Sequence, residues 1–321
     1  MITPFSSRAA RFTFALLLVA LAANSSFGQE QSAPQRRSGF APPLPAGTSA
    51  KYDVPYVEGG GKSQSLDIFV PAGAAKPMPL VIWIHGGGWQ QGDKAQSPAV
   101  GLLRWGYVVA SINYRLTDEA IFPAQINDCK AAVRWLRAHA EEYHIDPDHI
   151  GAWGASAGGH LVALLGTAGD QKDLEGTGGN EKFASNVQAV CDLFGPSDLA
   201  RVLDDTAANS ALPKLLGGPL RQHLDDAKRA SPITYVTKDD PPFLILHGTK
   251  DPLVNVRQSK WLDDALTKAG VDSHLEILDG AGHGGPEFAT IENRKMVLAF
   301  FDKHLKPDAK PQSDATTKPV K

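Results

Sequence analysis

The sequence predicts an α/β protein in which a mostly parallel central sheet has helices on both faces and carries a small cap excursion. Three observations support this fold class. Short, continuously apolar runs alternate along the chain with longer amphipathic runs, which is typical of parallel strands joined by helices. One stretch rich in proline and glycine interrupts this alternation. A glycine-serine-glycine turn joins one apolar run directly to a helix-like run.

Short apolar runs mark the predicted strands. The central ones are apolar at consecutive rather than alternate positions, so we expect both of their faces to be buried. The predicted strands span residues 66–70, 80–84, 107–112, 149–153, 187–194, 243–247 and 274–278.

Longer runs have the spacing of amphipathic helices. In the first of them Ala131, Trp135 and Ala138 fall on one face at helical spacing. Gly270 follows the third and suits the C-terminal cap of a helix. The predicted helices span residues 126–143, 157–166, 256–269 and 291–304.

The composition divides the chain into a folded body and two polar ends. The body covers residues 51–305, and its interrupting stretch at 198–241 is predicted to form the cap. Residues 29–50 and 306–321 are rich in Pro, Ser, Gln, Ala and Lys, so they are predicted to be a disordered leader and tail.

The first residues have the pattern of a secretory signal. Residues 1–28 combine Arg8 and Arg11 with an apolar run at 14–23 and small residues before Gln29. We therefore expect a secreted or periplasmic protein. The apolar run is short for a bilayer span, so we expect no stable membrane span in the mature chain, with an uncleaved N-terminal anchor as the alternative.

The overall composition excludes some classes of function. The net charge of the 321 residues is -3, which gives no electrostatic reason to expect a nucleic-acid partner. The two cysteines, Cys129 and Cys191, fall in a helix-like and a strand-like run. We expect them to be buried small residues, since they lack the spacing of a metal site.

The stretch Gly-Ala-Ser-Ala-Gly at 154–158 is the strongest functional signal. It lies between an apolar run and a helix-like run, and this strand-turn-helix context is typical of a nucleophilic serine. Ser156 is therefore the candidate nucleophile. A glycine-rich loop with an incidental serine is the alternative.

The candidate acid is Asp251. It follows the buried-type strand 243–247, and active sites form at the carboxyl ends of strands in open α/β sheets. An ordinary turn aspartate is the alternative. Asp192 and Asp272 are less well placed as acids.

The candidate base is His283. It lies in the glycine-rich loop between the last predicted strand and the last predicted helix. A serine hydroxyl needs such a base, and the base needs an orienting acid. His247 ends a strand and His160 begins a helix, so we expect both to form structural hydrogen bonds beneath the site.

A fourth stretch, His-Gly-Gly-Gly-Trp at 85–89, supplies candidate oxyanion donors. It follows the predicted strand 80–84, and glycines expose backbone N–H groups that can stabilise an oxyanion. The donors are assigned to Gly87, Gly88 and Ala157. A phosphate-binding loop is disfavoured because both common glycine spacings of such loops are missing.

At these motifs the chain resembles the hormone-sensitive-lipase-like and feruloyl/acetyl-xylan-esterase-like α/β-hydrolases. The resemblance covers about residues 52–305. The cap differs from the helical N-terminal cap of the lipase-like branch, which favours the small esterase branch. The motifs are His-Gly-Gly-Gly-Trp, Ser-Ile-Asn-Tyr-Arg-Leu at 111–116, Gly-Ala-Ser-Ala-Gly-Gly-His-Leu, His-Gly-Thr-Lys-Asp at 247–251 and Gly-His at 282–283.

The resemblance implies a carboxylester hydrolase with Ser156, Asp251 and His283 as its triad and no metal or cofactor. The expected substrate is a small-molecule or polysaccharide-linked ester of acetyl or feruloyl type. Trp89 and the cap are expected to line the substrate pocket.

Two alternatives belong to other classes. The elbow and the acid motif are also similar to prolyl-oligopeptidase-like peptidases or amidases, although these usually carry a large β-propeller, for which the chain has no room. A non-catalytic, hydrolase-fold binding protein is the other alternative, although such proteins usually lose a triad residue.

Overall fold

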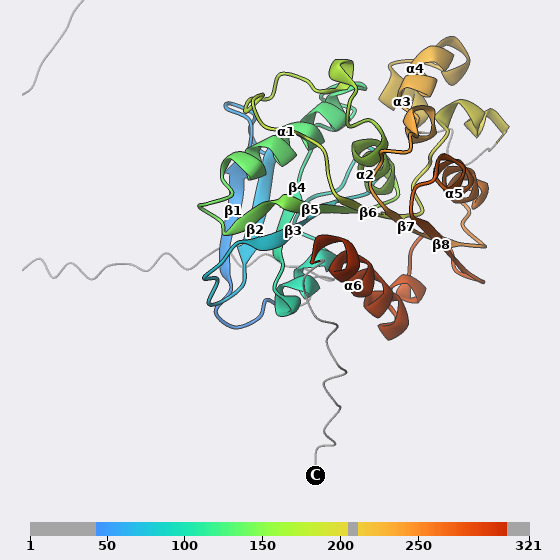
Figure 1. Cartoon of the computed structure of the whole chain (residues 1–321). Helices are drawn as coiled ribbons and strands as arrows, with labels where there is room; N and C mark the ends of the chain where they lie inside the picture. The colour runs from blue at the N-terminus through green and yellow to red at the C-terminus, as the bar shows by residue number, and fades with distance from the viewer. Residues whose placement is uncertain (1–42, 205–210, 307–321) are drawn as a thin grey trace, which may run out of the picture. The chain divides into compact units, whose positions relative to one another are not determined.

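The computed structural model describes residues 43–204 and 211–306. An eight-stranded sheet runs through this part in the order β1-β2-β4-β3-β5-β6-β7-β8 (Figure 1). Strands β3 to β8 are parallel to one another, whereas β2 is antiparallel to both of its neighbours. The strands are β1 Ser49–Pro55, β2 Ser65–Val70, β3 Met78–Ile84, β4 Val108–Ile112, β5 Ile145–Ala155, β6 Ala189–Leu193, β7 Phe243–Gly248 and β8 Ser273–Leu278.

Helices cover both faces of the sheet. Figure 1 shows α6 on one side and α1, α2 and α5 on the other. In β3, Val81 and Trp83 pack into the core beneath α6, while Leu80, Ile82 and Ile84 pack into the core beneath α1 and α2. The consecutive apolar residues of this strand therefore serve two cores. The helices named here are α1 Ala124–Ala138, α2 Ala157–Thr167, α5 Arg257–Ala269 and α6 Ile291–Leu305.

The predicted fold class is confirmed, and each predicted strand and helix is present. The predicted helix at residues 126–143 is too long at its C-terminal end: α1 ends at Ala138. The chain turns there so that β5 can begin at Ile145. The edge strand β1 and the 3₁₀ helix η1, Pro98–Trp105, were not predicted.

Between β6 and β7 the described chain forms short helices instead of a strand-helix unit. These pieces, which we call the cap, lie beside α2 and α5 (Figure 1). They are η3 Leu199–Asp204, α3 Leu212–Leu216, η5 Leu220–Gln222, α4 Leu224–Arg229 and η6 Pro232–Tyr235.

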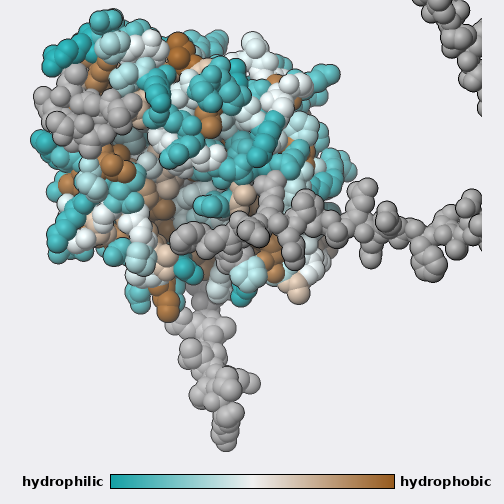
Figure 2. All heavy atoms as spheres, turned by 180° about the vertical axis from the view of Figure 1, so that it is seen from behind, coloured by the Kyte–Doolittle hydropathy of each residue, from teal (hydrophilic) through white to brown (hydrophobic). Residues whose placement is uncertain are grey.

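The surface of the described chain is mixed. On the face drawn in Figure 2, hydrophilic residues predominate and apolar residues lie in small separate groups. Within residues 43–204 and 211–306, no helix is long and apolar enough to cross a membrane. The predicted signal peptide, most of the leader and all but the first residue of the tail lie outside the described residues.

Candidate active site

Three strands of the parallel part of the sheet, β5, β7 and β8, bring the candidate residues together at their carboxyl ends. Ser156 follows β5 directly, and β6 lies between β5 and β7. Asp251 follows β7, and His283 follows β8 at the edge of the sheet. Because these strands are parallel, their carboxyl ends meet at the same edge.

Ser156 occupies a strained turn. Its backbone has φ 56° and ψ -120° at the start of α2, a conformation that is costly for a residue with a Cβ. The turn leaves no space beside the serine. A Cβ on Gly154 would overlap the carbonyl of Gly158, and a Cβ on Gly158 would overlap the carbonyl of Ile84. The glycines of the motif are therefore required by close backbone contacts.

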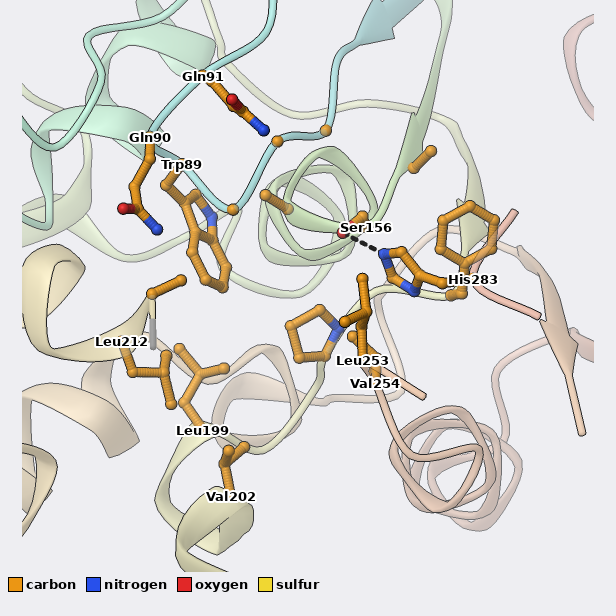
Figure 3. Close-up of a pocket in the computed structure, with 18 residues that line it drawn as sticks. Trp89, Gln90, Gln91, Ser156, Leu199, Val202, Leu212, Leu253, Val254 and His283 are labelled. Carbon is orange, nitrogen blue, oxygen red and sulfur yellow. Dashed lines mark hydrogen bonds between the residues drawn. The ribbon is translucent and has the colours of Figure 1, made fainter. Parts of the chain in front are cut away.

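A continuous chain of hydrogen bonds links the three candidates. His283 Nε2 lies 2.7 Å from Ser156 Oγ (Figure 3). On the other side of the ring, His283 Nδ1 lies 2.7 Å from Asp251 Oδ2. An ionised carboxylate only accepts hydrogen bonds, so Nδ1 carries the imidazole proton. Nε2 is then free to accept the hydrogen bond of the serine hydroxyl.

Asp251 is held as an anion by several donors. Its Oδ1 accepts hydrogen bonds from the N–H groups of Leu253 and Val254 at 2.8 and 2.9 Å. Burial opposes ionisation, but the contacts with His247 and His283 outweigh it and hold the pKa of Asp251 well below its usual value. Asp251 is therefore a carboxylate at neutral pH.

His247 is the second imidazole beside the acid. Its Nε2 donates to the carbonyl of Val254 at 2.9 Å and lies 3.2 Å from Asp251 Oδ2. Its Nδ1 accepts from Ser259 Oγ at 2.6 Å. His247 thus forms hydrogen bonds beneath the site, as the sequence predicted, and it also fixes the acid.

The other polar candidates do not join this chain of hydrogen bonds. Asp192 is fully buried, its Oδ1 accepts the N–H of Gly195 at 2.9 Å, and burial raises its pKa to about 6. His160 is also fully buried and donates from Nε2 to the carbonyl of Ala230 at 2.7 Å. Burial lowers the pKa of His160 to about 4, so this imidazole is neutral at pH 7.

The glycine loop after β3 passes beside the serine. A Cβ on Gly86 would lie 3.2 Å from Ser156 Cβ. Among the described residues, no hydrogen-bond acceptor is found for the backbone N–H groups of Gly87, Gly88 and Ala157. All three residues line the same cavity as Ser156. They have the position that donors to an oxyanion need.

The Ser-Ile-Asn-Tyr-Arg-Leu motif supports this loop from below. Tyr114 stacks on the His85 ring at 4.5 Å between ring centroids and donates its hydroxyl to the His85 carbonyl at 3.0 Å. Asn113 accepts the N–H of Lys94 at 2.7 Å. The motif therefore fixes both ends of the segment that carries the three glycines.

The cavity next to Ser156 has a volume of about 400 Å³. Its apolar compartment lies between Trp89 and the cap residues Leu199, Val202 and Leu212 (Figure 3). Gln90 and Gln91, which follow Trp89 in the chain, also line the cavity. Trp89 is 4% exposed and donates from Nε1 to His160 Nδ1 at 3.3 Å, so it is a fixed wall rather than a mobile surface residue.

The described residues contain neither a metal-binding cluster nor an exposed cysteine. Residues 43–204 and 211–306 contain no group of three or more His, Cys, Asp or Glu side chains that could hold a metal ion. Cys129 and Cys191 are both buried, as expected from their positions in the sequence, and they are not bonded to each other.

Comparison with known proteins identifies the family. The sequence profile of the BD-FAE family matches residues 66–266. The chain belongs to the BD-FAE family. This BD-FAE protein is 34% identical to the esterase LipQ of Mycobacterium tuberculosis over 85% of its own length and 68% of LipQ. It is also 34% identical to the probable carboxylic ester hydrolase LipM of the same organism, but it spans only 51% of that relative.

Solved structures give the same relationship. The BD-FAE protein superposes on a truncated carbohydrate esterase from gut microbiota with a TM-score of 0.76 and 36% identity, covering 79% of this chain and 95% of the other. It superposes on esterase Est2 of Thermogutta terrifontis with a TM-score of 0.66 and 26% identity, covering 83% and 96%. The BD-FAE protein is an esterase with the α/β-hydrolase fold.

The sequence reasoning missed Phe194 and only partly predicted the role of His247. Phe194 directly follows β6 and packs on His283, and His247 in β7 lies beside Asp251 in addition to forming the predicted structural hydrogen bonds. Phe194 carries no motif, and its neighbourhood depends on which strands lie side by side. His247 belongs to the His-Gly-Thr-Lys-Asp motif, so its spacing to Asp251 was the available signal.

Proposed function

We propose that this BD-FAE protein hydrolyses carboxylic esters through an acyl intermediate on Ser156. The observation that carries the proposal is the unbroken hydrogen-bond chain from Ser156 through His283 to Asp251. A serine hydroxyl is a weak nucleophile, and this arrangement supplies both its base and the group that orients the base.

Acylation uses the backbone N–H donors on one side of Ser156 and the His283–Asp251 pair on the other. The ester carbonyl oxygen lies against the N–H groups of Gly87, Gly88 and Ala157, and each such donor stabilises the oxyanion by about 3–4 kcal/mol. His283 takes the Ser156 proton as the hydroxyl oxygen attacks the carbonyl carbon. Asp251 stabilises the resulting imidazolium. His283 then gives the proton to the departing alcohol, and the acyl group stays on the serine.

Deacylation reverses these roles for water. His283 removes a proton from a water molecule that attacks the acyl carbon, and the same N–H groups stabilise the second oxyanion. The proton then passes from His283 to Ser156 as the acid leaves. Each step needs only the residues of this chain.

The cavity supports short acyl groups as substrates. Its apolar compartment is bounded by Trp89 on one side and by the buried cap residues Leu199, Val202 and Leu212 on the other. A long chain would have to displace these side chains. A related solved structure is named a carbohydrate esterase, and the amides of Gln90 and Gln91 offer hydrogen bonds to a sugar hydroxyl. We therefore assign acetyl- or feruloyl-type esters of carbohydrates as the substrate class.

A substrate panel tests this function. The purified protein is assayed on p-nitrophenyl esters from acetyl to dodecanoyl, on the matching anilides, and on acetylated and feruloylated oligosaccharides. The proposal expects turnover of short esters, release of acetate or ferulate from the sugars, and no cleavage of the anilides. Preferred cleavage of anilides would favour a peptidase, and preference for dodecanoyl esters would contradict the assignment of short acyl groups.

Export is a separate proposal that rests on the sequence of residues 1–28. The full-length chain is expressed in a bacterial host, and the periplasmic fraction is analysed by N-terminal sequencing. We expect the mature protein to begin at Gln29. Recovery of the uncleaved chain in the membrane fraction would instead support an anchor.

A further inference from the structure

Phe194 stands directly after β6, between the strands that carry the nucleophile and the acid. Its backbone φ is 46°, a conformation that a residue with a bulky side chain seldom adopts. The surrounding hydrogen bonds hold it in place. Phe194 N–H donates to the carbonyl of Leu246 at 2.9 Å, and the preceding carbonyl of Leu193 accepts the N–H of Ser156 at 2.8 Å.

The strained backbone changes where the ring points. Along β6, Cys191 and Leu193 pack into the core beneath α6 and Val190 packs into the opposite core. Regular alternation would send the next side chain to the face of Val190. Phe194 instead joins the same core as Leu193. Strained residues of this kind gather at functional sites, where the strain serves a purpose.

The Phe194 ring packs against the imidazole of His283. The two ring centroids are 4.6 Å apart and the planes cross at 61°. The Phe194 ring also contacts Phe288 and His247, with distances between ring centroids of 4.7 and 6.4 Å. Phe194 is only 6% exposed, so the ring is fixed in place.

His283 needs lateral support of this kind. It is followed in its loop by two glycines, Gly284 with φ 86° and Gly285 with φ 119°. Because glycine has no Cβ, these residues do little to restrict the position of the imidazole. The hydrogen bonds to Ser156 and Asp251 hold two atoms of the imidazole but allow it to rotate about the line that joins them. A packed aromatic ring opposes that rotation.

We propose that Phe194 is a positioning residue, whose ring holds the His283 imidazole in the plane that connects Ser156 with Asp251. The inference rests on the proposed triad. Phe194 also lines the cavity beside Ser156, but because its ring packs directly on the His283 imidazole we assign it to the proton transfers rather than to ester recognition. Loss of the ring should therefore lower kcat and leave KM nearly unchanged.

Two variants and one control test this role. Phe194→Leu keeps an apolar side chain and removes the ring, and Phe194→Ala removes nearly all contact. Phe288→Leu is the matched control, because it also removes a ring that packs on Phe194 but has no aromatic contact with His283. Each protein is assayed for kcat and KM on p-nitrophenyl acetate and for thermal stability. The downfield N–H signal of the histidine that is bonded to Asp251 is followed by proton NMR.

The expected result is a loss of kcat of about three- to tenfold in Phe194→Leu and a larger loss in Phe194→Ala, as for a lost aromatic pair. KM should change less than about twofold, and the NMR signal should broaden in both variants. Phe288→Leu should keep the kcat and the signal of the parent protein.

Three results would overturn the inference: an unchanged kcat in Phe194→Leu, an unchanged NMR signal, or equal losses of kcat in Phe288→Leu. Failure of the proposed triad is recognised separately, because Ser156→Ala would then retain turnover. If Ser156→Ala is inactive and Phe194→Leu is fully active, only the role of Phe194 is wrong.

Discussion

The catalytic edge of the sheet and the cap are held in place by different means. At the edge, backbone turns fix the reacting groups, and Ser156 and Phe194 both have positive φ values. In the cap, side chains make several of the attachments, beside a backbone hydrogen bond from Phe122 N–H to the carbonyl of Leu215 at 2.8 Å. Gln258 Oε1 accepts the N–H groups of Ser197 and Asp198 at 2.8 and 2.7 Å, and His160 holds the carbonyl of Ala230. The candidate catalytic residues are thus held mainly by the backbone, whereas the cap is held largely by side chains and forms one wall of the cavity.

Removal of the base should give the largest effect and should not depend on the cap. His283→Ala is expected to lower the rate on p-nitrophenyl acetate by up to about 10⁶-fold, because no other described side chain is hydrogen-bonded to Ser156 Oγ. The cap surface variant Leu224→Ala should keep the parent rate. A His283→Ala protein within tenfold of the parent would contradict the assignment of the base.

The rigid turn should tolerate no added methyl group. Gly158→Ala places a Cβ on the carbonyl of Ile84, so we expect a loss of about 2 kcal/mol or more in the free energy of unfolding, together with loss of activity. Gly101→Ala is the matched control, since a Cβ there meets no neighbouring atom within 4 Å. Urea unfolding of both variants measures the difference. Equal stability of the two would contradict the account of a crowded elbow.

The attachment of the cap through His160 should depend on pH. The pKa of His160 is lowered to about 4 by burial, against about 6.5 for an unfolded histidine. Between these values the unfolded chain binds the proton and the folded chain does not, so stability falls as the pH drops. The shift corresponds to at most about 3 kcal/mol lost between pH 7 and pH 4.

His160→Gln isolates this effect, because the oppositely shifted Asp192 is present in both proteins. The parent should lose more unfolding free energy than His160→Gln when urea unfolding is repeated from pH 7 to pH 4.5. Parallel pH curves for the two proteins would show that His160 does not couple protonation to folding.

The smallest expected effect comes from a cap residue that lines the cavity, and it concerns the preference for acyl length. Val202→Ala removes two methyl groups from the apolar compartment and should raise the ratio of kcat/KM for hexanoyl over acetyl esters about three- to tenfold, since each added CH₂ is worth about 0.8 kcal/mol. Val133→Ala, a fully buried position on α1 away from the cavity, should leave this ratio unchanged. The two ratios are read from p-nitrophenyl ester assays.

The central fold could be predicted because buried strands leave continuous apolar runs in the sequence. The edge strand β1 could not, since only Ala50 and Val54 of it are even partly buried and the other residues are exposed. A buried ion pair between Lys94 and Asp67 and a second contact of Lys94 with Asp53 tie this edge to the rest of the protein. Contacts between distant residues of this kind leave no local pattern.

The same dependence on contacts between distant residues decides which parts of the site could be predicted from the sequence. Ser156, Asp251 and His283 lie in motifs whose order and position after strands could be read from the chain. Phe194 and the cap leucines act through neighbours that only the strand order brings together. The sequence therefore predicted which polar residues the structure brings together better than the residues that position them or shape the cavity.

Covalent labelling tests the central claim most directly. The protein is treated with a serine-directed fluorophosphonate, and the adduct is measured by intact mass and located by peptide mapping. We predict one adduct per chain, on Ser156, with loss of esterase activity in proportion to labelling and no adduct in Ser156→Ala. An adduct on another residue, or ester hydrolysis that persists in Ser156→Ala, would contradict the account.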